Sequence, residues 1–243
     1  VDKDKLENAV GILAAFFEKG GEIVNCATDA LAKVLDMTSK GVLAFQALLA
    51  DIASGAFSED SIQDGQLMTS MNAMNTVLNS YGVESAGYGI SIEDFMASLG
   101  EGESGILWVD GDHYITVTKE NGEYSVSDPN RNDGEPITYD EENFKKLITG
   151  EKAEGKDSSG NTVEAEGYTN VAAENGNRQF PTASESVAEA AGEGGVLSEQ
   201  DMVEIMGVSS GARSVRGAGT KPRTETRPGP RTGRLTGTTA APE

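Results

Sequence analysis

An Asn121-Gly122 dipeptide between two alternating runs constrains the fold of this chain more than any other feature. Apolar and polar side chains alternate on both sides of the dipeptide, as they do in half-buried strands. Asn-Gly favours the positive φ values that a two-residue hairpin turn requires. Such a turn pairs Glu120 with Glu123, so that the numbers of all paired residues sum to 243. The sequence therefore predicts an antiparallel hairpin of fixed register.

This register brings a histidine and an aspartate together. His113 opens the first run and Asp128 closes the second. Paired as predicted, Asp128 faces Ile115 and Asn130 faces His113, and all four side chains share one face of the hairpin. Asp128 is then the diagonal neighbour of His113, where a carboxylate accepts an imidazole N–H and fixes the tautomer. A slip of one residue would move Asp128 to the other face.

The only cysteine of the chain, Cys26, stands where a helix is predicted to begin. Asn25 suits the N-cap position of that helix. Unpaired backbone N–H groups and the helix dipole favour an anion there, and the backbone N–H of Cys26 is a candidate oxyanion donor. A thiol with a histidine and a carboxylate nearby is the arrangement of a nucleophile, its general base and an orienting group. We therefore predict that Cys26, His113 and Asp128 act together.

Each of these residues has a simpler explanation when it is taken alone. A lone cysteine is more often a small buried apolar residue than a nucleophile. His113 follows two aspartates, which is typical of an exposed turn, and Asp128-Pro129-Asn130 is a common way to end a strand. The predicted geometry that joins all three is more specific than any single member, and it favours catalysis.

Composition divides the chain into four parts. Twelve of the 14 aromatic residues fall within residues 1–150, so we place the folded domain there. Residues 151–195 form an acidic segment rich in Gly, Ala and Ser, which is typical of a linker. Residues 196–207 predict a short amphipathic helix. Residues 208–243 carry seven Lys and Arg against two acidic residues, and we expect a basic disordered tail.

The charge and hydropathy of the chain exclude two classes of partner. Its net charge is −21, and residues 1–150 alone carry −17, which argues against nucleic acid as a ligand. The acidic body would attract a cationic partner instead. The chain contains no run of 18 apolar residues and no basic-then-apolar N-terminus, so we expect neither a membrane span nor a secretory signal. The compartment, cytoplasmic or secreted, stays open.

Helical patterns precede strand patterns within residues 1–150. Leu6, Val10, Leu13 and Phe17 predict the buried face of a first helix that ends at Gly20. The same reasoning places helices near residues 26–35, 41–52, 67–78 and 91–99, a strand at 105–109, and a last helix after Asp140. Helices followed by a small antiparallel sheet predict an α+β fold.

Four short stretches resemble the papain-like cysteine peptidases that process double-glycine leader peptides, the bacterial bacteriocin-processing peptidases and their free-standing relatives. They are residues 25–31 (NCATDAL), 112–117 (DHYITV), 127–130 (SDPN) and 144–150 (FKKLITG). The resemblance implies a papain-like fold over residues 1–150. It also implies that Cys26 is the nucleophile, His113 the base and Asp128 the orienting group.

The chain departs from this family around the nucleophile. The family carries a Gln shortly before the cysteine as a second oxyanion donor, whereas residues 20–25 contain none. Ala27 and Thr28 stand where the family has Gly-Pro. We name Asn25 and Asn130 as candidate oxyanion or supporting residues. Two alternatives to a peptidase stay open, namely a catalytically weak module that binds leader peptides and a secreted effector with the same fold.

Residues 197–208 (LSEQDMVEIMGV) resemble a double-glycine leader, with Gly207 at the first glycine position and Val208 at the second. The simpler interpretation is a short helix that Ser198 caps with Asp201 and in which Leu197 packs on Met202. In both interpretations the helix is amphipathic, and we expect segment 196–207 to contact the domain of its own chain.

The chain offers few metal ligands. One Cys and one His are too few for a zinc site, and the acidic clusters at 110–112 and 130–133 lack the spacing of a calcium loop. We therefore expect no metal and no cofactor. The predicted partner is a peptide or protein substrate.

Overall fold

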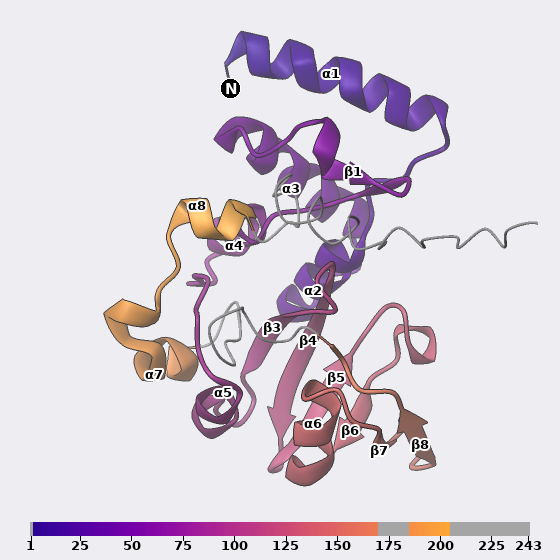
Figure 1. Cartoon of the computed structure of the whole chain (residues 1–243), viewed down its shortest axis with the longest axis vertical. Helices are drawn as coiled ribbons and strands as arrows, with labels where there is room; N and C mark the ends of the chain where they lie inside the picture. Colours follow the sequence, from indigo (N-terminus) through magenta and orange to yellow (C-terminus); the bar gives the residue numbers. More distant parts are fainter. Residues whose placement is uncertain (1, 170–184, 205–243) are drawn as a thin grey trace, which may run out of the picture. The chain divides into compact units, whose positions relative to one another are not determined.

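The computed structural model describes residues 2–169 and 185–204, which belong to one compact unit. Helices come first and an antiparallel sheet follows, so the predicted α+β class is confirmed (Figure 1). Within these two ranges, no helix is both long and apolar enough to cross a membrane.

Most of the helices in residues 2–150 begin at a polar N-cap residue, a role that the sequence predicts for Asn25. Asn25, Ser70, Ser91 and Asp140 each accept a backbone N–H from the third residue that follows, which satisfies a group the first helical turn leaves unpaired. The helices of residues 2–150 are α1 (Lys3–Glu18), α2 (Cys26–Leu35), α3 (Lys40–Ser54), α4 (Met71–Ser80), α5 (Ile92–Ser98) and α6 (Glu141–Ile148).

The predicted buried face of α1 is wrong for Leu6, Val10 and Phe17, whereas Leu13 is partly buried. Val10 and Phe17 are 57% and 51% exposed, whereas Ala9 and Phe16 are buried. Two apolar stripes lie next to each other on this helix, and periodicity alone does not choose between them. The stripe that contains Ala9 and Phe16 packs against Leu48 of α3, and that packing sets the orientation of the helix.

The predicted hairpin is confirmed with its register. Strand β4 (His113–Glu120) pairs antiparallel with β5 (Glu123–Ser127), and Glu120 lies opposite Glu123. The turn residues Asn121 and Gly122 have φ values of 54° and 76°, the conformation that the dipeptide favours.

The sheet extends past residue 150, so the predicted linker is wrong for residues 151–169. The six strands lie in chain order: β3 (Ser104–Val109), β4, β5, β6 (Ile137–Tyr139), β7 (Ala153–Lys156) and β8 (Thr162–Ala165). In β7, Ala153 and Gly155 point inward while Glu154 and Lys156 are exposed. These strands are short and carry small inward residues, so their composition looks like that of a linker.

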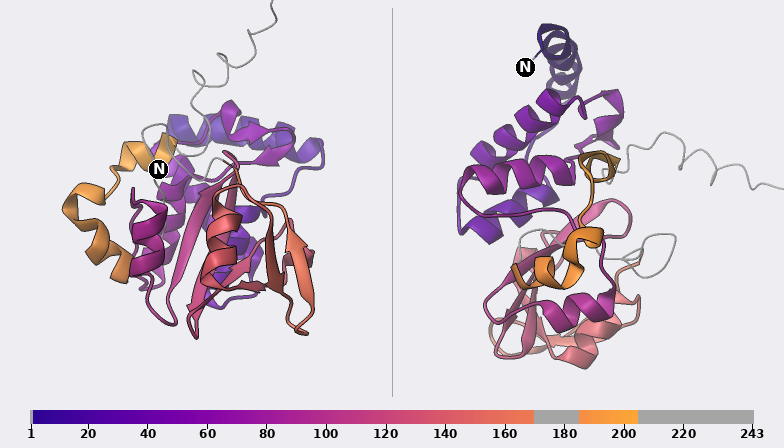
Figure 2. Two further views of the ribbon diagram at one scale, coloured as in Figure 1. Left: turned by 60° about the horizontal axis from the view of Figure 1, so that its bottom comes forward. Right: turned by 90° about the vertical axis from the view of Figure 1, so that its left-hand side faces the viewer.

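Helices pack on both faces of this sheet (Figure 2). On one face, side chains of α5 and α6 form a core with alternate residues of β4, such as Ile115 and Val117. On the other face, α2, α3 and α4 pack around Ile106, Trp108 and Tyr114. The sheet is therefore the middle layer, and α2 crosses the face that carries Tyr114.

Two further helices follow the sheet. They are α7 (Glu185–Gly195) and α8 (Glu199–Glu204). Helix α7 corrects the predicted linker once more, because residues 185–195 are helical on both sides of a kink at Gly192. The predicted helix in 196–207 is confirmed for Glu199–Glu204 but not for residues 196–198, and residues 205–207 lie outside the described ones. The predicted tail 208–243 also lies outside them. A two-stranded hairpin, β1 (Ile62–Gln63) and β2 (Gln66–Leu67), precedes α4.

Candidate active site

Cys26 is the first residue of α2, and its neighbour Asn25 fixes the start of the helix. The Asn25 side-chain oxygen accepts the backbone N–H of Thr28 at 3.0 Å. The Asn25 amide nitrogen donates to the carbonyl oxygen of Leu67 and to Oγ1 of Thr69, both at 2.8 Å. Asn25 therefore ties the cysteine to the segment that leads into α4.

These contacts limit what Asn25 does chemically. A side-chain amide has two N–H donors, and both are engaged, which leaves none for the oxyanion role suggested by the sequence. The backbone N–H of Cys26 belongs to the first turn of α2, where helix geometry supplies no acceptor. This backbone N–H is therefore a candidate oxyanion donor.

His113 opens β4 and interacts with both a carboxylate and a thiol. Its side chain is buried, with the residue only 7% exposed, and Nε2 lies 2.7 Å from Oδ1 of Asp128. The Cys26 side chain also interacts with the imidazole, closely enough to raise the pKa of His113. Because Nε2 faces Asp128, Nδ1 is the nitrogen left for the thiol. The structure thus brings together the three residues that the sequence selected.

Opposing effects set the pKa of His113. Burial lowers this pKa, but hydrogen bonds and charge interactions with Asp128 and Cys26 raise it by more, to about 10. The raised pKa favours the protonated imidazole at neutral pH.

Asp128 is itself held by several donors. It is 4% exposed, and its Oδ2 accepts the Tyr168 hydroxyl at 2.5 Å while its Oδ1 accepts the Asn130 backbone N–H at 2.8 Å. Nε of Arg131 lies 3.4 Å from Oδ2. Burial acts to raise the pKa of Asp128, but the hydrogen bonds from His113 and Tyr168 outweigh it, and the net shift is downward. The carboxylate is therefore kept ionised beside the imidazole.

Asn130 supports the carboxylate through its backbone only. Its backbone N–H makes the bond to Asp128, and the residue is exposed. The predicted role of its side chain at the oxyanion is not supported by this placement.

Sequence reasoning missed Tyr168 and Arg131. The Arg131 guanidinium lies over the Tyr168 ring, 3.8 Å from its centroid, so the two side chains close over Oδ2 of Asp128 together. Tyr168 lies beyond the predicted domain end at residue 150. One signal was present, because Tyr168 is one of only two aromatic residues after that boundary.

A buried carboxylate supports the other end of the site. Asp51 accepts the backbone N–H of Ser70 at 3.1 Å and its hydroxyl at 2.5 Å. Burial raises the pKa of Asp51 to about 6, against the lowering effect of both Ser70 hydrogen bonds. Ser70 caps α4 and follows Thr69, which binds Asn25. The contacts therefore run without a gap from Asp51 to the residue before Cys26.

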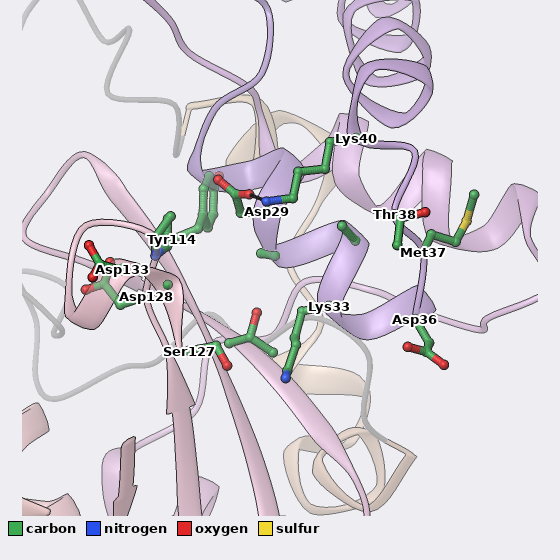
Figure 3. A pocket seen from close by; sticks show the side chains of 15 residues that line it. Asp29, Lys33, Asp36, Met37, Thr38, Lys40, Tyr114, Ser127, Asp128 and Asp133 are labelled. Atoms are coloured by element: carbon green, nitrogen blue, oxygen red, sulfur yellow. Dashed lines mark ion pairs between the residues drawn. The ribbon is translucent and has the colours of Figure 1, made fainter. Parts of the chain in front are cut away.

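A cavity of about 460 Å³ opens beside Asp128 (Figure 3). Residues of α2 form one wall, and the ends of β4 and β5 form the other. Its charges are mixed, since Asp29 and Lys40 form an ion pair at the rim. Neither Cys26 nor His113 lines this cavity, which therefore lies behind the carboxylate rather than at the thiol.

Among residues 2–169 and 185–204, no three His, Cys, Asp or Glu side chains are grouped closely enough to hold a metal ion.

Comparison with protein-family models, curated proteins and solved structures found no match to this chain.

Proposed function

We propose that this protein is a papain-like cysteine peptidase in which Cys26 is the nucleophile, His113 the acid–base and Asp128 the orienting group. One observation carries the proposal, namely that the buried His113 is hydrogen-bonded to Asp128 and also interacts with the Cys26 side chain. The short motifs around Cys26, His113 and Asp128, which resemble the bacteriocin-processing peptidases, add to it.

The geometry supports a two-step reaction. The Cys26 thiolate attacks the carbonyl carbon of the scissile peptide bond, and the backbone N–H of Cys26 stabilises the oxyanion. The His113 imidazolium gives its proton to the leaving amine as the C–N bond breaks, and a thioester remains on Cys26. Water then attacks the thioester with His113 as base, which releases the carboxylic acid and restores the thiolate–imidazolium pair. Asp128 accepts the Nε2–H throughout and fixes the tautomer.

The proposed substrate is a peptide with a helical, leader-like segment before the scissile bond, because the motifs resemble those of leader-processing peptidases. The chain's own residues 197–208 have this pattern, and the proposed bond would follow a glycine such as Gly207, which lies outside the described residues.

A comparison of the wild-type chain with Cys26→Ala tests the proposal. Each is incubated with a mixture of peptides, and new carboxyl ends are identified by mass spectrometry. We expect new ends with the wild type alone. Identical peptide profiles for the two chains would contradict a peptidase.

A peptide-binding module with weak or no catalysis is the second candidate. It is favoured by the Asn25 amide, whose donors are both engaged and which therefore adds nothing to the oxyanion site. Such a module would bind a leader-like peptide equally well after Cys26→Ala, and neither chain would cleave it.

A further inference from the structure

Residues 185–204 lie along one side of the domain and contact three of its elements. Helix α7 packs on α5, residues 195–197 run beside residues 87–89, and α8 lies beside α4 (Figure 1). The contacts of residues 195–197 and of α8 define a surface on the domain. The chemistry of these contacts indicates which kind of peptide the surface binds.

The first part of this surface is a backbone edge. The Gly89 N–H donates to the carbonyl of Gly195, and the Leu197 N–H donates to the carbonyl of Gly87, both at 2.8 Å. Tyr88 and Val196 face each other as an antiparallel bridge. Main-chain bonds of this kind accept an extended peptide with little regard to its sequence.

The second part selects a helix with a defined start. Ser198 accepts the backbone N–H of Asp201 at 3.1 Å, and the Asp201 carboxylate binds back to the Ser198 hydroxyl at 2.7 Å and to its backbone N–H at 3.2 Å. This is a capping box, and Leu197 and Met202 occupy the two positions of the hydrophobic staple that accompanies it. Both side chains pack on the core that α4 shares with α2.

Gly87 leaves space for this helix because it has no side chain. A Cβ at residue 87 would lie 2.7 Å from the sulfur of Met202 and 3.0 Å from that of Met71. The side-chain amide of Asn75 lies 2.9 Å from the same Met202 sulfur. Glycine at 87 therefore makes room for one apolar side chain, four residues after the helix N-cap.

The surface and the thiol border the same apolar cluster. Met71 is the first residue of α4, two positions after Thr69, which binds Asn25 beside Cys26. Cys26, Leu197 and Met202 all pack, partly buried, against one apolar cluster.

Charge opposes this docking. Residues 185–204 carry six acidic side chains and no Lys or Arg, and residues 1–150 have a net charge of −17. Apolar and main-chain contacts therefore hold the segment against like-charge repulsion, which salt screens.

We infer that the Gly87–Gly89 edge and the first turns of α4 form a peptide-docking surface, and that residues 195–204 of the same chain are its occupant. The surface takes an extended stretch that continues into a capped helix with apolar residues flanking the cap as Leu197 and Met202 do. Its use as an anchor for the substrate of Cys26 rests on the proposed function, but the docking itself does not.

A binding measurement on full-length chains tests this inference. Leu197→Asp with Met202→Asp undocks the occupant, and a labelled peptide of residues 185–204 is then titrated by fluorescence anisotropy. We expect the undocked chain to bind the peptide at least ~10-fold more tightly than the wild type, because a tethered occupant competes at roughly millimolar effective concentration. Binding tightens with added salt. A peptide with the same two Asp substitutions does not bind, and Gly87→Ala in the undocked chain weakens binding.

Equal binding to both chains, or no binding by an undocked chain that still unfolds cooperatively, would overturn the inference. If the double variant does not fold, hydrogen exchange of the wild type decides. A displaceable occupant predicts that the Gly89 and Leu197 amides exchange at least ~10-fold faster than the Val117 amide of β4, through local opening. Exchange of all three at one common rate would overturn it. Cys26 alkylation, measured on the same chains, separates the two proposals, since peptide binding with an inert thiol removes the peptidase and leaves the docking surface.

Discussion

Tyr168→Phe removes the hydroxyl that donates to Oδ2 of Asp128 and leaves the ring in place. This bond is buried, and its acceptor is a carboxylate with a lowered pKa. A hydrogen bond to a charged group contributes about 1.5–3 kcal/mol, against about 1 kcal/mol for a neutral pair. We expect the free energy of unfolding to fall by about 2 kcal/mol, or the melting temperature by ~4–8 °C.

Tyr124→Phe is the matched control, because the Tyr124 hydroxyl is also buried but donates to a neutral acceptor, the Met96 carbonyl, at 3.1 Å. Its loss should cost about 1 kcal/mol. Urea unfolding of both variants at pH 7 and at pH 3 measures the difference.

The sign of the pH effect follows from Asp128. Its pKa in the folded protein is lowered, so the stability it contributes is present above the unfolded value of about 3.9 and is lost as the pH falls through the folded pKa. The excess cost of Tyr168→Phe over Tyr124→Phe should therefore be largest at pH 7 and shrink as the pH falls through the folded pKa of Asp128. Equal costs at pH 7, or an excess that does not change with pH, would refute the assignment of Tyr168 as a donor to an ionised Asp128.

Three further predictions concern the elements around the site. Asn25→Ala removes the α2 cap and two further hydrogen bonds, and we expect it to lower the free energy of unfolding by about 2–3 kcal/mol. It should also slow alkylation of Cys26, and an unchanged alkylation rate would contradict the positioning role of Asn25. Because the pKa of Asp51 is raised to about 6, the wild type should lose stability as the pH rises from about 4 to 6. Urea unfolding at each pH measures this slope, and Asp51→Asn should flatten it. An unchanged slope in the variant would contradict the raised pKa of Asp51. Gly122→Ala forces a φ of 76° on alanine and should lower the free energy of unfolding by about 1–2 kcal/mol. Gly11→Ala adds a Cβ in open space on α1 and should raise the free energy of unfolding by about 0.5–1 kcal/mol. Thermal melts that rank the two variants the other way would contradict the turn geometry.

Local sequence was sufficient for the part of the site that depends on one hairpin. The Asn121-Gly122 turn and the alternation beside it determine the register of β4 and β5, and the register places Asp128 beside His113. The N-cap role of Asn25 could be predicted from the sequence equally well, because an N-cap side chain bonds within the first turn of its own helix.

The parts that the sequence did not predict depend on contacts between distant residues. Tyr168 reaches Asp128 across 40 positions, through strands β7 and β8, whose short length and small inward residues hide their pattern. The second role of Asn25, as a donor to Thr69, arises only when α4 packs beside α2.

The orientation of α1 was missed for a related reason. Both of its apolar stripes satisfy helical periodicity, and only the packing of Phe16 with Leu48 and Ile52 of α3 selects one of them. A helix with two candidate faces needs its partner before its buried side is known.

The pH dependence of Cys26 alkylation, in the wild type and in His113→Ala, tests the central claim most directly. A thiolate–imidazolium pair predicts a wild-type rate that is already high near pH 6 and varies little up to pH 9. In His113→Ala the rate should rise only as the pH approaches ~8.5, the ordinary value for a thiol. A wild-type profile that follows the His113→Ala profile, or a thiol that does not react at any pH, would contradict the pairing of Cys26 with His113.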